Sequence, residues 1–597
     1  MNLALLVAAA AIFAASVVLA ARAFPGPRRL GERAVLTGVL AVALPIACVR
    51  ALSPFGWIAR GPLLALALAV GASAFAAAGE RARRRALEDG RTALRLARSA
   101  FTRGSAAPLA WIGLGSLACA AVAAWRFAPW AWDALGYHLP IVNDAIATHT
   151  LRTVPTNILY VNAYPRAVET FFVAVRALLW RDTWIDFAQA PFALVACAST
   201  AALARRAGAS PARALTFGLA FLAVPLVMLQ LATNYVDLAV AALLAASVYF
   251  ATSPVLSPTD VGAWALSTGL LLGSKPSMPP IVAVLVLVVM VRAARAHGAG
   301  LGLGLAALGC GAVLAIGGET YVANLAVHGN PIWPIALDVG PVHLAGEDLA
   351  QPMFVQGLPP GLAQASWGHR VLVSLFVEPS VYIYDMRLGG FGPLCAWGLV
   401  PLAVVGAVRA PRSAWPALLL GVCALATPAA HWMRFALALP VALLALTSTA
   451  VGASKWRIAA DLSLAALAAV GLAHALPGLR AGSAGVDGRE SLWAALRETI
   501  GPGESFAYDA SFSLPGQLTS GDGRSGAPVY LGHARTADDV DRALAEGNAR
   551  VVVAGDFAVT REAILRSHGE YRLAFRCPLD SCDVFVRRRP ESPPVVE

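Results

Sequence analysis

Apolar runs of membrane-spanning length recur along most of this chain, and they constrain its fold more than any other feature. A transmembrane helix needs about 20 mostly apolar residues to cross a bilayer, and about 14 runs reach or approach that length. They lie at residues 2–21, 34–50, 61–79, 105–127, 186–204, 214–231, 238–252, 262–274, 279–292, 301–318, 392–408, 413–429, 435–452 and 457–476. Because 58% of the residues are hydrophobic and only 14% are charged, the sequence predicts a mainly α-helical, polytopic membrane bundle.

Arginine residues between the apolar runs predict which side of the membrane each loop faces. The strongest group consists of Arg81, Arg83, Arg84, Arg85, Arg91, Arg95, Arg98 and Arg103. Lys and Arg near span ends resist translocation, so this segment is predicted to be a cytoplasmic loop of an inner membrane protein. Alternation from this loop places the other positive loops in the cytoplasm, at residues 205–213, 292–295, 409–412 and 455–457. The net charge of +11 therefore reflects topology and does not indicate nucleic acid as a partner.

The alternation depends on how three segments are interpreted. Residues 2–21 have no basic segment before them and are followed by further spans, so they are predicted to be a membrane helix rather than a signal peptide. Val168–Trp180 is short and carries Glu169 and Arg176, which favours an interfacial helix lying along the membrane in the first outer loop. Residues 273–280 contain helix breakers and a lysine, and they predict a turn at the outer surface.

The composition changes after about residue 478. A helical pattern at Ala537–Glu546 and an apolar run at residues 549–554 predict a small α/β domain outside the membrane. Cys577 and Cys582 lie five residues apart, a spacing that a hairpin can close, and an extracytoplasmic location permits a disulfide between them. The predicted domains are residues 1–104, with additional spans and the basic cytoplasmic loop, residues 105–477, the membrane core, and residues 478–597, the extracytoplasmic α/β domain.

Polar and ionisable residues gather at the ends of spans that this topology places on the extracytoplasmic face. They are Asp133, Tyr137, His138, Asn234, Asp237, Lys275 and Arg434. Charges at the edge of a membrane are costly, so they tend to be paired or functional. One charged group at a span end is equally well explained as an ordinary interfacial residue. Two carboxylates, a lysine, an arginine and a histidine on one side favour a shared site.

Several segments around these residues resemble motifs of one enzyme family, in the family's order. Trp132–Pro140 resembles the first outer loop of the C-type (GT-C) membrane glycosyltransferases, and Ala232–Asp237 resembles their second acidic motif. Gly273–Lys275 resembles the Gly-Thr-Lys-Tyr turn of bacterial members related to the dolichyl-phosphate-mannose protein mannosyltransferases. Further segments that look similar to such members are Tyr321–Asn324, Gly329–Pro334, Asp385–Pro393 and Trp432–Phe435. The resemblance covers residues 105 to about 455 and implies a GT-C-like catalytic core.

The resemblance implies a reaction, a donor and a location. Such enzymes transfer a sugar with inversion from a polyprenyl-phosphate donor to an acceptor outside the cytoplasm. The chain is therefore expected to be a mannosyltransferase-like enzyme of the cell envelope that transfers a hexose or pentose to a lipid, glycan or protein acceptor. Many enzymes of this kind look metal-independent, so the resemblance implies no metal, and no paired CxxC spacing is present. The sequence also has no Gly-rich phosphate loop, so neither a cofactor nor a nucleotide sugar is predicted.

The residue types fit this chemistry. The sugar develops oxocarbenium character while the leaving phosphate gains charge, so the site needs a carboxylate near the acceptor hydroxyl and cations near the phosphate. Asp133 is the candidate general base. Lys275, Arg387 and Arg434 are candidates for holding the phosphate, since arginine can grip two oxygens at once. Asp237 has three open roles, which are to orient the sugar, to pair with Lys275, or to share a divalent ion with Asp133.

The other candidate substrate-binding residues have structural explanations beside functional ones. His138, five residues after Asp133, either contacts the phosphate or sugar or packs in the loop with bonds to backbone. Tyr137 is either an interfacial anchor or a platform for a sugar ring. Asn234 is expected to bind substrate because it lies within the second acidic motif.

Two alternatives to an enzyme remain. A membrane transporter or flippase would also have many spans and ionisable groups, but it predicts polar residues at mid-membrane depth and a repeat between the two halves. The charged groups here lie at span ends on one side, and no internal repeat is evident. A degenerate family member with a scaffolding role is the third possibility, and the presence of both Asp133 and Asp237 argues against it.

Overall fold

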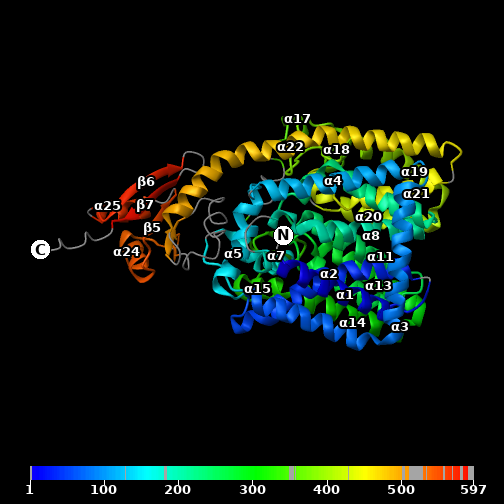
Figure 1. The fold of residues 1–597 in the computed structure, drawn as a ribbon, viewed down its shortest axis with the longest axis horizontal. Coiled ribbons are helices and arrows are strands. Elements are labelled where there is room, and N and C mark those ends of the chain that lie inside the picture. Colours follow the sequence, from blue (N-terminus) through cyan, green and yellow to red (C-terminus); the bar gives the residue numbers. More distant parts are fainter. Residues whose placement is uncertain are drawn as a thin grey trace, which may run out of the picture.

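The computed structural model has a helical bundle followed by a small sheet domain (Figure 1). The last long helix, α22 (Arg457–Thr499), runs along one edge of the bundle and leads to the sheet domain. The structure describes residues 3–588 except residues 28, 128, 157, 180–183, 348–354, 356–357, 428, 453, 501–503, 510–528, 533, 556–557, 568 and 578–581.

The N-terminal helices cover one side of the bundle. α1 (Leu3–Ala23) packs against α2 (Leu30–Leu52) and α3 (Arg60–Thr102), and Figure 1 shows these blue helices together. The short turn η1 (Ser53–Phe55) separates α2 from α3. α3 is kinked at Gly79, whose φ of 73° is accessible mainly to glycine. The arginine-rich segment beyond this kink, predicted as a loop, is helical.

α4 (Ala107–Arg126) leads into the first long connecting segment. This segment contains the π-helical turn η2 (Ala134–His138), α5 (Leu139–Thr148), α6 (Leu159–Ala163), α7 (Ala167–Leu178) and the 3-10 turn η3 (Ile185–Gln189). α7 overlaps the predicted interfacial helix Val168–Trp180, and it packs against α2 and α5 with nearly all of its side chains buried. Its placement along a membrane surface stays a prediction.

The next helices include the most deeply buried part of the bundle, α10 and α11. They are α8 (Ala190–Arg206), α9 (Pro211–Ala220), η4 (Phe221–Ala223), α10 (Pro225–Leu231), α11 (Asp237–Ala251), α12 (Pro258–Leu272), α13 (Pro279–His297) and α14 (Ala299–Gly317). The axis bends by 70° between the helices on either side of Val224. Proline at the start of α10 cannot continue the preceding hydrogen-bond ladder, which accounts for the bend. α10 ends at Leu231, and the loop after it leads to Asp237 at the start of α11.

A second long connecting segment separates α14 from the last membrane helices. It contains α15 (Glu319–His328), the antiparallel strands β1 (Leu337–Val339) and β2 (Val342–Leu344), α17 (Pro360–Ala363) and α18 (Trp367–Phe376). The bundle then closes with the π-helical turn η5 (Leu394–Leu399), α19 (Val400–Arg409), α20 (Pro411–Leu425), the 3-10 turn η6 (Met433–Ala436), α21 (Leu439–Gly452) and α22.

Glycines let some of these helices approach closely. A Cβ added at Gly113 of α4 would lie 2.2 Å from the Leu219 carbonyl oxygen of α9. A Cβ at Gly406 of α19 would lie 2.4 Å from the Leu446 carbonyl oxygen of α21. Small residues at helix interfaces are typical of membrane bundles, where close backbone packing replaces the hydrophobic effect.

The C-terminal domain is a mixed sheet with two helices. Its strands are β3 (Phe506–Tyr508), β4 (Val529–Tyr530), β5 (Val551–Ala554), β6 (Tyr571–Cys577) and β7 (Cys582–Arg587), in the order β4-β3-β5-β7-β6. β3 is parallel to β4 and β5, whereas β7 is antiparallel to β5 and β6. The helices α24 (Ala537–Glu546) and α25 (Ala558–Arg566) complete the predicted α/β fold.

Two predictions for this domain have different outcomes. The bounds of α24 match the predicted helix, and a capping box of Thr536 and Asp539 explains its start. The backbone pairs Cys577 with Cys582 across the β6–β7 hairpin. Their side chains lie outside the described part of the chain, so the disulfide stays a prediction. The predicted domain boundary at residue 478 falls inside α22.

Membrane-spanning helices account for most of the bundle. Among the described residues, eight helices are long and apolar enough to cross a membrane, or nine if α9 and α10 form one broken span. Three further apolar helices are shorter, at Asp237–Ala251, Leu394–Arg409 and Ala438–Gly452. Every predicted apolar run overlaps a helix, and the chain is a multi-pass membrane protein. The count of about 14 spans stays a prediction.

Candidate functional site

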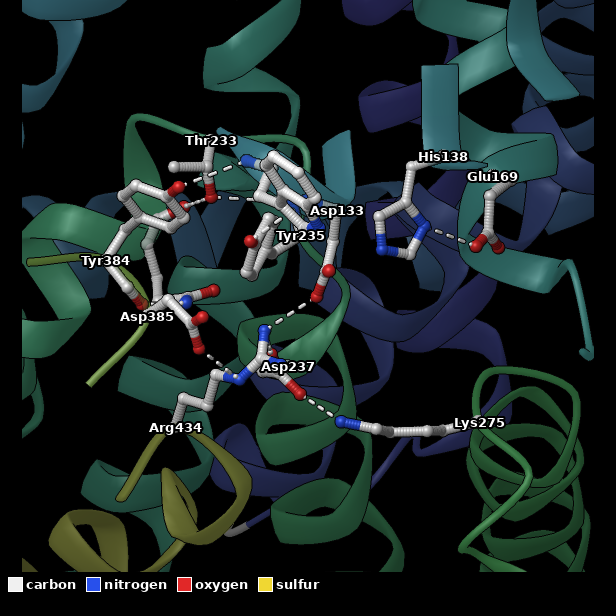
Figure 2. A network of polar contacts seen from close by, with 12 residues as sticks. Asp133, His138, Glu169, Thr233, Tyr235, Asp237, Lys275, Tyr384, Asp385 and Arg434 are labelled. Carbon is white, nitrogen blue, oxygen red and sulfur yellow. Dashed lines mark hydrogen bonds and ion pairs between the residues drawn. The ribbon is translucent and has the colours of Figure 1, made fainter. Parts of the chain in front are cut away.

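The turn that carries Asp133 is π-helical for a local reason. Pro140 has no backbone N–H, and its ring would collide with a carbonyl of the preceding turn in a regular α-helix. The chain widens over η2, where the Leu139 N–H bonds to the Ala134 carbonyl five residues earlier. This spacing places Asp133 and His138 on the same side of the turn, and Figure 2 shows both side chains in one polar cluster.

Arg434, in η6, is surrounded by three carboxylates (Figure 2). Its Nη1 donates to Asp133 Oδ2 at 2.8 Å and lies 3.6 Å from Asp237 Oδ2. Its Nε lies 3.1 Å from Asp385 Oδ1. The arginine side chain is only 8% exposed. One guanidinium thus joins the π-helical turn, the start of α11 and the loop before η5.

Lys275 reaches the same cluster from the turn between α12 and α13, whose predicted presence is confirmed. Its Nζ pairs with Asp237 and lies 3.7 Å from the centre of the Phe435 ring, within cation–π range. The Tyr321 hydroxyl donates to the Leu272 and Lys275 carbonyl oxygens at 3.0 and 3.2 Å. These bonds fix the turn so that the ammonium group faces the carboxylates.

Carboxylates outnumber these cations. With one formal negative charge for each of Asp133, Asp237 and Asp385 and one formal positive charge for each of Arg434 and Lys275, the sum is −1 (−3 + 2). Burial raises the pKa of Asp385, although the charge of Arg434 opposes the effect. Burial lowers the pKa of Lys275, and the charge of Asp237 opposes that shift. Groups pushed toward their neutral forms and clustered in this way are typical of functional sites.

Aromatic rings enclose the cations of the cluster. The Arg434 Cζ lies 4.7 Å from the centre of the Phe435 ring, 5.0 Å from Tyr235 and 5.6 Å from Trp432. Arg387 lies over the same indole, with its Cζ 4.9 Å from the Trp432 ring centre. Its charge also acts on Asp385. Arg387 therefore borders the cluster and shares one aromatic side chain with Arg434.

Two tyrosines fix the start of the π-helical turn. The Trp132 N–H donates to the Tyr384 hydroxyl at 3.1 Å, and the Asp133 N–H donates to the Tyr235 hydroxyl at 3.0 Å. The two tyrosine rings pack edge to face with their centres 5.3 Å apart. The position of the Asp133 carboxylate is thus set by residues of the α10–α11 loop and of the loop before η5.

Asn234 has a supporting contact. Its fully buried Nδ2 donates to the Ile185 carbonyl at 2.7 Å. Gln189 binds the same loop, because its Nε2 donates to the Gln230 and Thr233 carbonyls at 2.9 and 3.1 Å. These bonds position the loop that leads to Asp237. The predicted substrate contact of Asn234 stays a prediction.

His138 pairs with a residue that the sequence prediction left out. Its Nδ1 lies 2.7 Å from Glu169 Oε1 of α7, and both side chains are almost fully buried. The imidazole also packs beside Tyr137 and Tyr235, with ring centres 4.0 and 6.1 Å away. Among the described residues, His138 bonds to this carboxylate and not to the loop backbone, and its predicted contact with substrate stays a prediction.

Tyr137 belongs to a group of three tyrosines near Asp133. Its ring centre lies 5.9 Å from that of Tyr160 and 6.3 Å from that of Tyr164. The charge of Asp133 adds to the effect of burial in raising the pKa of each of the three phenols. The group lines the side of the cluster formed by the first connecting segment.

The structure therefore brings Asp133, Asp237, Lys275 and Arg434 together, and their roles remain to be proposed. Sequence reasoning missed Asp385 and Glu169. Asp385 stands in a segment that resembles the family, where only the neighbouring arginine was chosen, and Glu169 is the sole acidic residue of α7. Within the described ranges, no three His, Cys, Asp or Glu side chains are arranged to hold a metal ion.

The chain is similar in fold to solved structures of ArnT. ArnT from Cupriavidus metallidurans, solved with undecaprenyl phosphate bound, is 15% identical with a TM-score of 0.52, over 80% of this chain and 97% of ArnT. The apo form of ArnT gives 16% identity, a TM-score of 0.53 and the same coverage. The Archaeoglobus fulgidus oligosaccharyltransferase matches at 12% identity and a TM-score of 0.40, over 74% of this chain and 68% of its own. No family model and no curated protein matches the sequence. The ArnT matches confirm the predicted GT-C fold.

Proposed function

We propose that this chain, which has the GT-C fold, is an inverting glycosyltransferase that uses a polyprenyl-phosphate sugar as donor. The observation that carries the proposal is the cluster in which Arg434 and Lys275 meet Asp133 and Asp237. A donor of this class needs cations at its phosphate and carboxylates at the sugar and acceptor. Both kinds of group lie together here. Undecaprenyl phosphate bound to ArnT supports a lipid of the same chemistry.

Arg434 and Lys275 are the proposed phosphate ligands. Negative charge builds on the phosphate as the glycosidic bond breaks, and fixed cations in a site that excludes water stabilise that charge strongly. The guanidinium of Arg434 can donate to two phosphate oxygens at once. In the structure these donors are shared among several carboxylates, so a phosphate would replace one acceptor without leaving the arginine unpaired. Arg387 is the proposed third cation, at the border of the site.

The carboxylates are proposed to act on the sugar and the acceptor. Asp237, which pairs with Lys275, is proposed to orient the donor sugar beside the phosphate. Asp133 is proposed to lie on the acceptor side, where the sequence makes it the candidate base. Tyr137 and Asn234 complete the proposed substrate contacts from the first connecting segment and the α10–α11 loop. No metal or cofactor enters the proposal.

The location is proposed from the distribution of charge. Lys and Arg residues near span ends favour the cytoplasm, and this distribution supports a location of the polar cluster and the C-terminal sheet domain on the extracytoplasmic face of the inner membrane. The acceptor is therefore a molecule of that compartment, such as a lipid, glycan or protein. The sheet domain is proposed to assist acceptor recognition or stability, because Tyr508 of β3 lies near enough to Asp144 and Arg152, in the segment that follows Asp133, to feel their charges.

Transfer from a labelled donor tests the function. Membranes containing the wild-type protein are expected to move radiolabelled sugar from polyprenyl phosphate to an endogenous acceptor, whereas Asp237→Asn should lower the rate on the order of a hundredfold. Asp538→Asn, an exposed change in the sheet domain, is the matched control and should leave the rate unchanged. Transfer by Asp237→Asn at the wild-type rate, or none by the wild type from any polyprenyl-phosphate sugar, would contradict the proposal.

A further inference from the structure

His138 and Glu169 form a buried pair that the proposed phosphate site does not use. The Nδ1–Oε1 distance is 2.7 Å, and the two side chains are 2% and 3% exposed. The charge of Arg166 interacts with Glu169, and the second carboxylate oxygen, Oε2, has no hydrogen-bond partner among the described residues. Burying such a pair is costly, and packing alone could be achieved by apolar residues of similar size. The pair therefore calls for a chemical explanation.

The contact with Glu169 sets the tautomer of the imidazole. An ionised carboxylate only accepts hydrogen bonds, so Nδ1 must carry a proton and donate it to Oε1. The lone pair of a neutral imidazole is then on Nε2. Nε2 has no hydrogen-bond partner in the described part of the chain. In Figure 2 the ring lies between Glu169 and Asp133, with its second nitrogen on the side of the Asp133 carboxylate.

The Asp133 carboxylate, unlike Nε2 of His138, already accepts a hydrogen bond from a described side chain. Its Oδ2 accepts a hydrogen bond from Arg434 Nη1 at 2.8 Å, so a proton arriving there must compete with a buried guanidinium. The π-helical turn nevertheless brings Asp133 and His138 to the same side, and Tyr235 contacts both of them. Two groups able to take a proton thus stand at opposite ends of one turn. Among the described residues, Arg434 already pairs with the Asp133 carboxylate, whereas Nε2 of His138 makes no hydrogen bond.

We infer that His138, supported by Glu169, removes the proton from the acceptor hydroxyl, while Asp133 holds Arg434 and orients the acceptor. This inference rests on the proposed glycosyl transfer. The acceptor oxygen attacks C1 of the sugar as the bond from C1 to the phosphate oxygen breaks, and that bond's electron pair leaves with the phosphate. The hydroxyl proton passes to Nε2 of His138. The resulting imidazolium keeps its Nδ1–H on Glu169 until Nε2 releases the proton to water.

An asparagine at position 138 separates this role from a structural one. The amide nitrogen of Asn occupies nearly the place of Nδ1, so His138→Asn keeps a donor for Glu169 but removes Nε2. We expect kcat to fall about 10²- to 10⁴-fold, the range for loss of a general base. The KM for the polyprenyl-phosphate sugar should stay near the wild-type value. If the pair only tied the turn to α7, this variant would keep its kcat.

The matched control is His343→Asn, on an exposed side chain of β2 that should leave kcat unchanged. Glu169→Gln provides a second readout. Its amide oxygen can still accept from Nδ1, but the imidazolium loses its negative partner, so the acidic limb of the pH–rate profile should move to lower pH. The other titratable groups that face the pair, Tyr137, Tyr235, Arg166 and Asp133, are unchanged in this variant.

The outcomes separate the inference from the proposed function. If the wild type transfers sugar and folded His138→Asn keeps its kcat, the inference is wrong and Asp133 takes the proton. If His138→Asn does not fold, an unshifted acidic limb in Glu169→Gln overturns the inference instead. A wild-type protein that transfers no sugar from any polyprenyl phosphate would contradict the proposed function itself.

Discussion

Arg213, which is mostly buried, and Arg434, which is buried, both pair with aspartates from distant segments, but they are paired differently. Arg213 of α9 meets Asp461 of α22 with two hydrogen bonds, Nη2 to Oδ1 at 2.7 Å and Nη1 to Oδ2 at 3.1 Å. Its Nε donates to the Ser448 carbonyl at 3.0 Å. The Ser105 hydroxyl adds a bond of 2.6 Å to Asp461. Each group of this pair has its own fixed partner.

Arg434 instead donates one hydrogen bond to Asp133 and has two further carboxylates nearby, so among the described residues it makes no two-bond contact with a single partner. Asp133, Asp237 and Asp385 lie 2.8 to 3.6 Å from its nitrogens, and Lys275 competes for one of them. Replacing one acceptor by a phosphate oxygen therefore leaves the guanidinium paired, whereas any exchange at Arg213 breaks a complete two-bond contact. Arg213 with Asp461 therefore acts as a structural clamp, whereas the surroundings of Arg434 are suited to exchanging a ligand.

Apolar replacement of each pair should give the largest difference between the two regions in the rate of sugar transfer. Buried ion pairs can often be replaced by apolar residues of similar volume with little loss of stability. We expect Arg213→Met with Asp461→Leu to remain folded and to transfer sugar at nearly the wild-type rate. Arg434→Met with Asp133→Leu should lower transfer at least about 10²- to 10³-fold, because phosphate stabilisation is lost. Transfer rates per folded molecule, from fluorescence-detected size-exclusion and a labelled-donor assay, measure both.

Equal losses in the two double variants would contradict the distinction between clamp and site. The single variant Arg213→Met separates stability from activity, because removing one partner of a buried pair costs about 3–5 kcal/mol of stability. That cost should appear in thermal unfolding and not in the rate per folded molecule.

A smaller effect is expected from the titration of Lys275. Burial lowers the pKa of this ammonium group, so it is protonated at low pH and loses its charge as the pH rises, below the usual lysine value of about 10.4. Donor binding should weaken on the order of tenfold across this range, the value of a charge-assisted hydrogen bond. Lys275→Arg should remove the alkaline rise in donor KM, because arginine stays protonated. An unchanged rise in the variant would show that another group titrates.

The helices could be predicted because their causes are local. Apolar runs of membrane length mark the bundle, and the capping box at Thr536 marks the start of α24. The turn near Lys275 follows from prolines and glycine in succession. The bend before α10 was not predicted, because Pro225 within an apolar run permits either a continued or a broken span.

The site could be predicted only in part. Asp133, Asp237 and Arg434 stand at span ends, and the alternation of positive loops put them on one face. Asp385 and Glu169 could not be assigned in this way, since their importance depends on tertiary contacts. Glu169 meets His138 only because α7 packs against α5. The π-helical turn that brings Asp133 and His138 to the same side likewise could not be predicted from the sequence.

The most direct test of whether Arg434 binds the donor phosphate is the binding of undecaprenyl phosphate without any sugar. A ligand present at about 100 times its Kd stabilises the folded state by about 2.7 kcal/mol, which raises the unfolding temperature in detergent. We expect this increase for the wild type and for the exposed control Arg412→Gln, and its loss in folded Arg434→Gln. An increase of the same size in Arg434→Gln would contradict the account, because the lipid phosphate would then bind elsewhere.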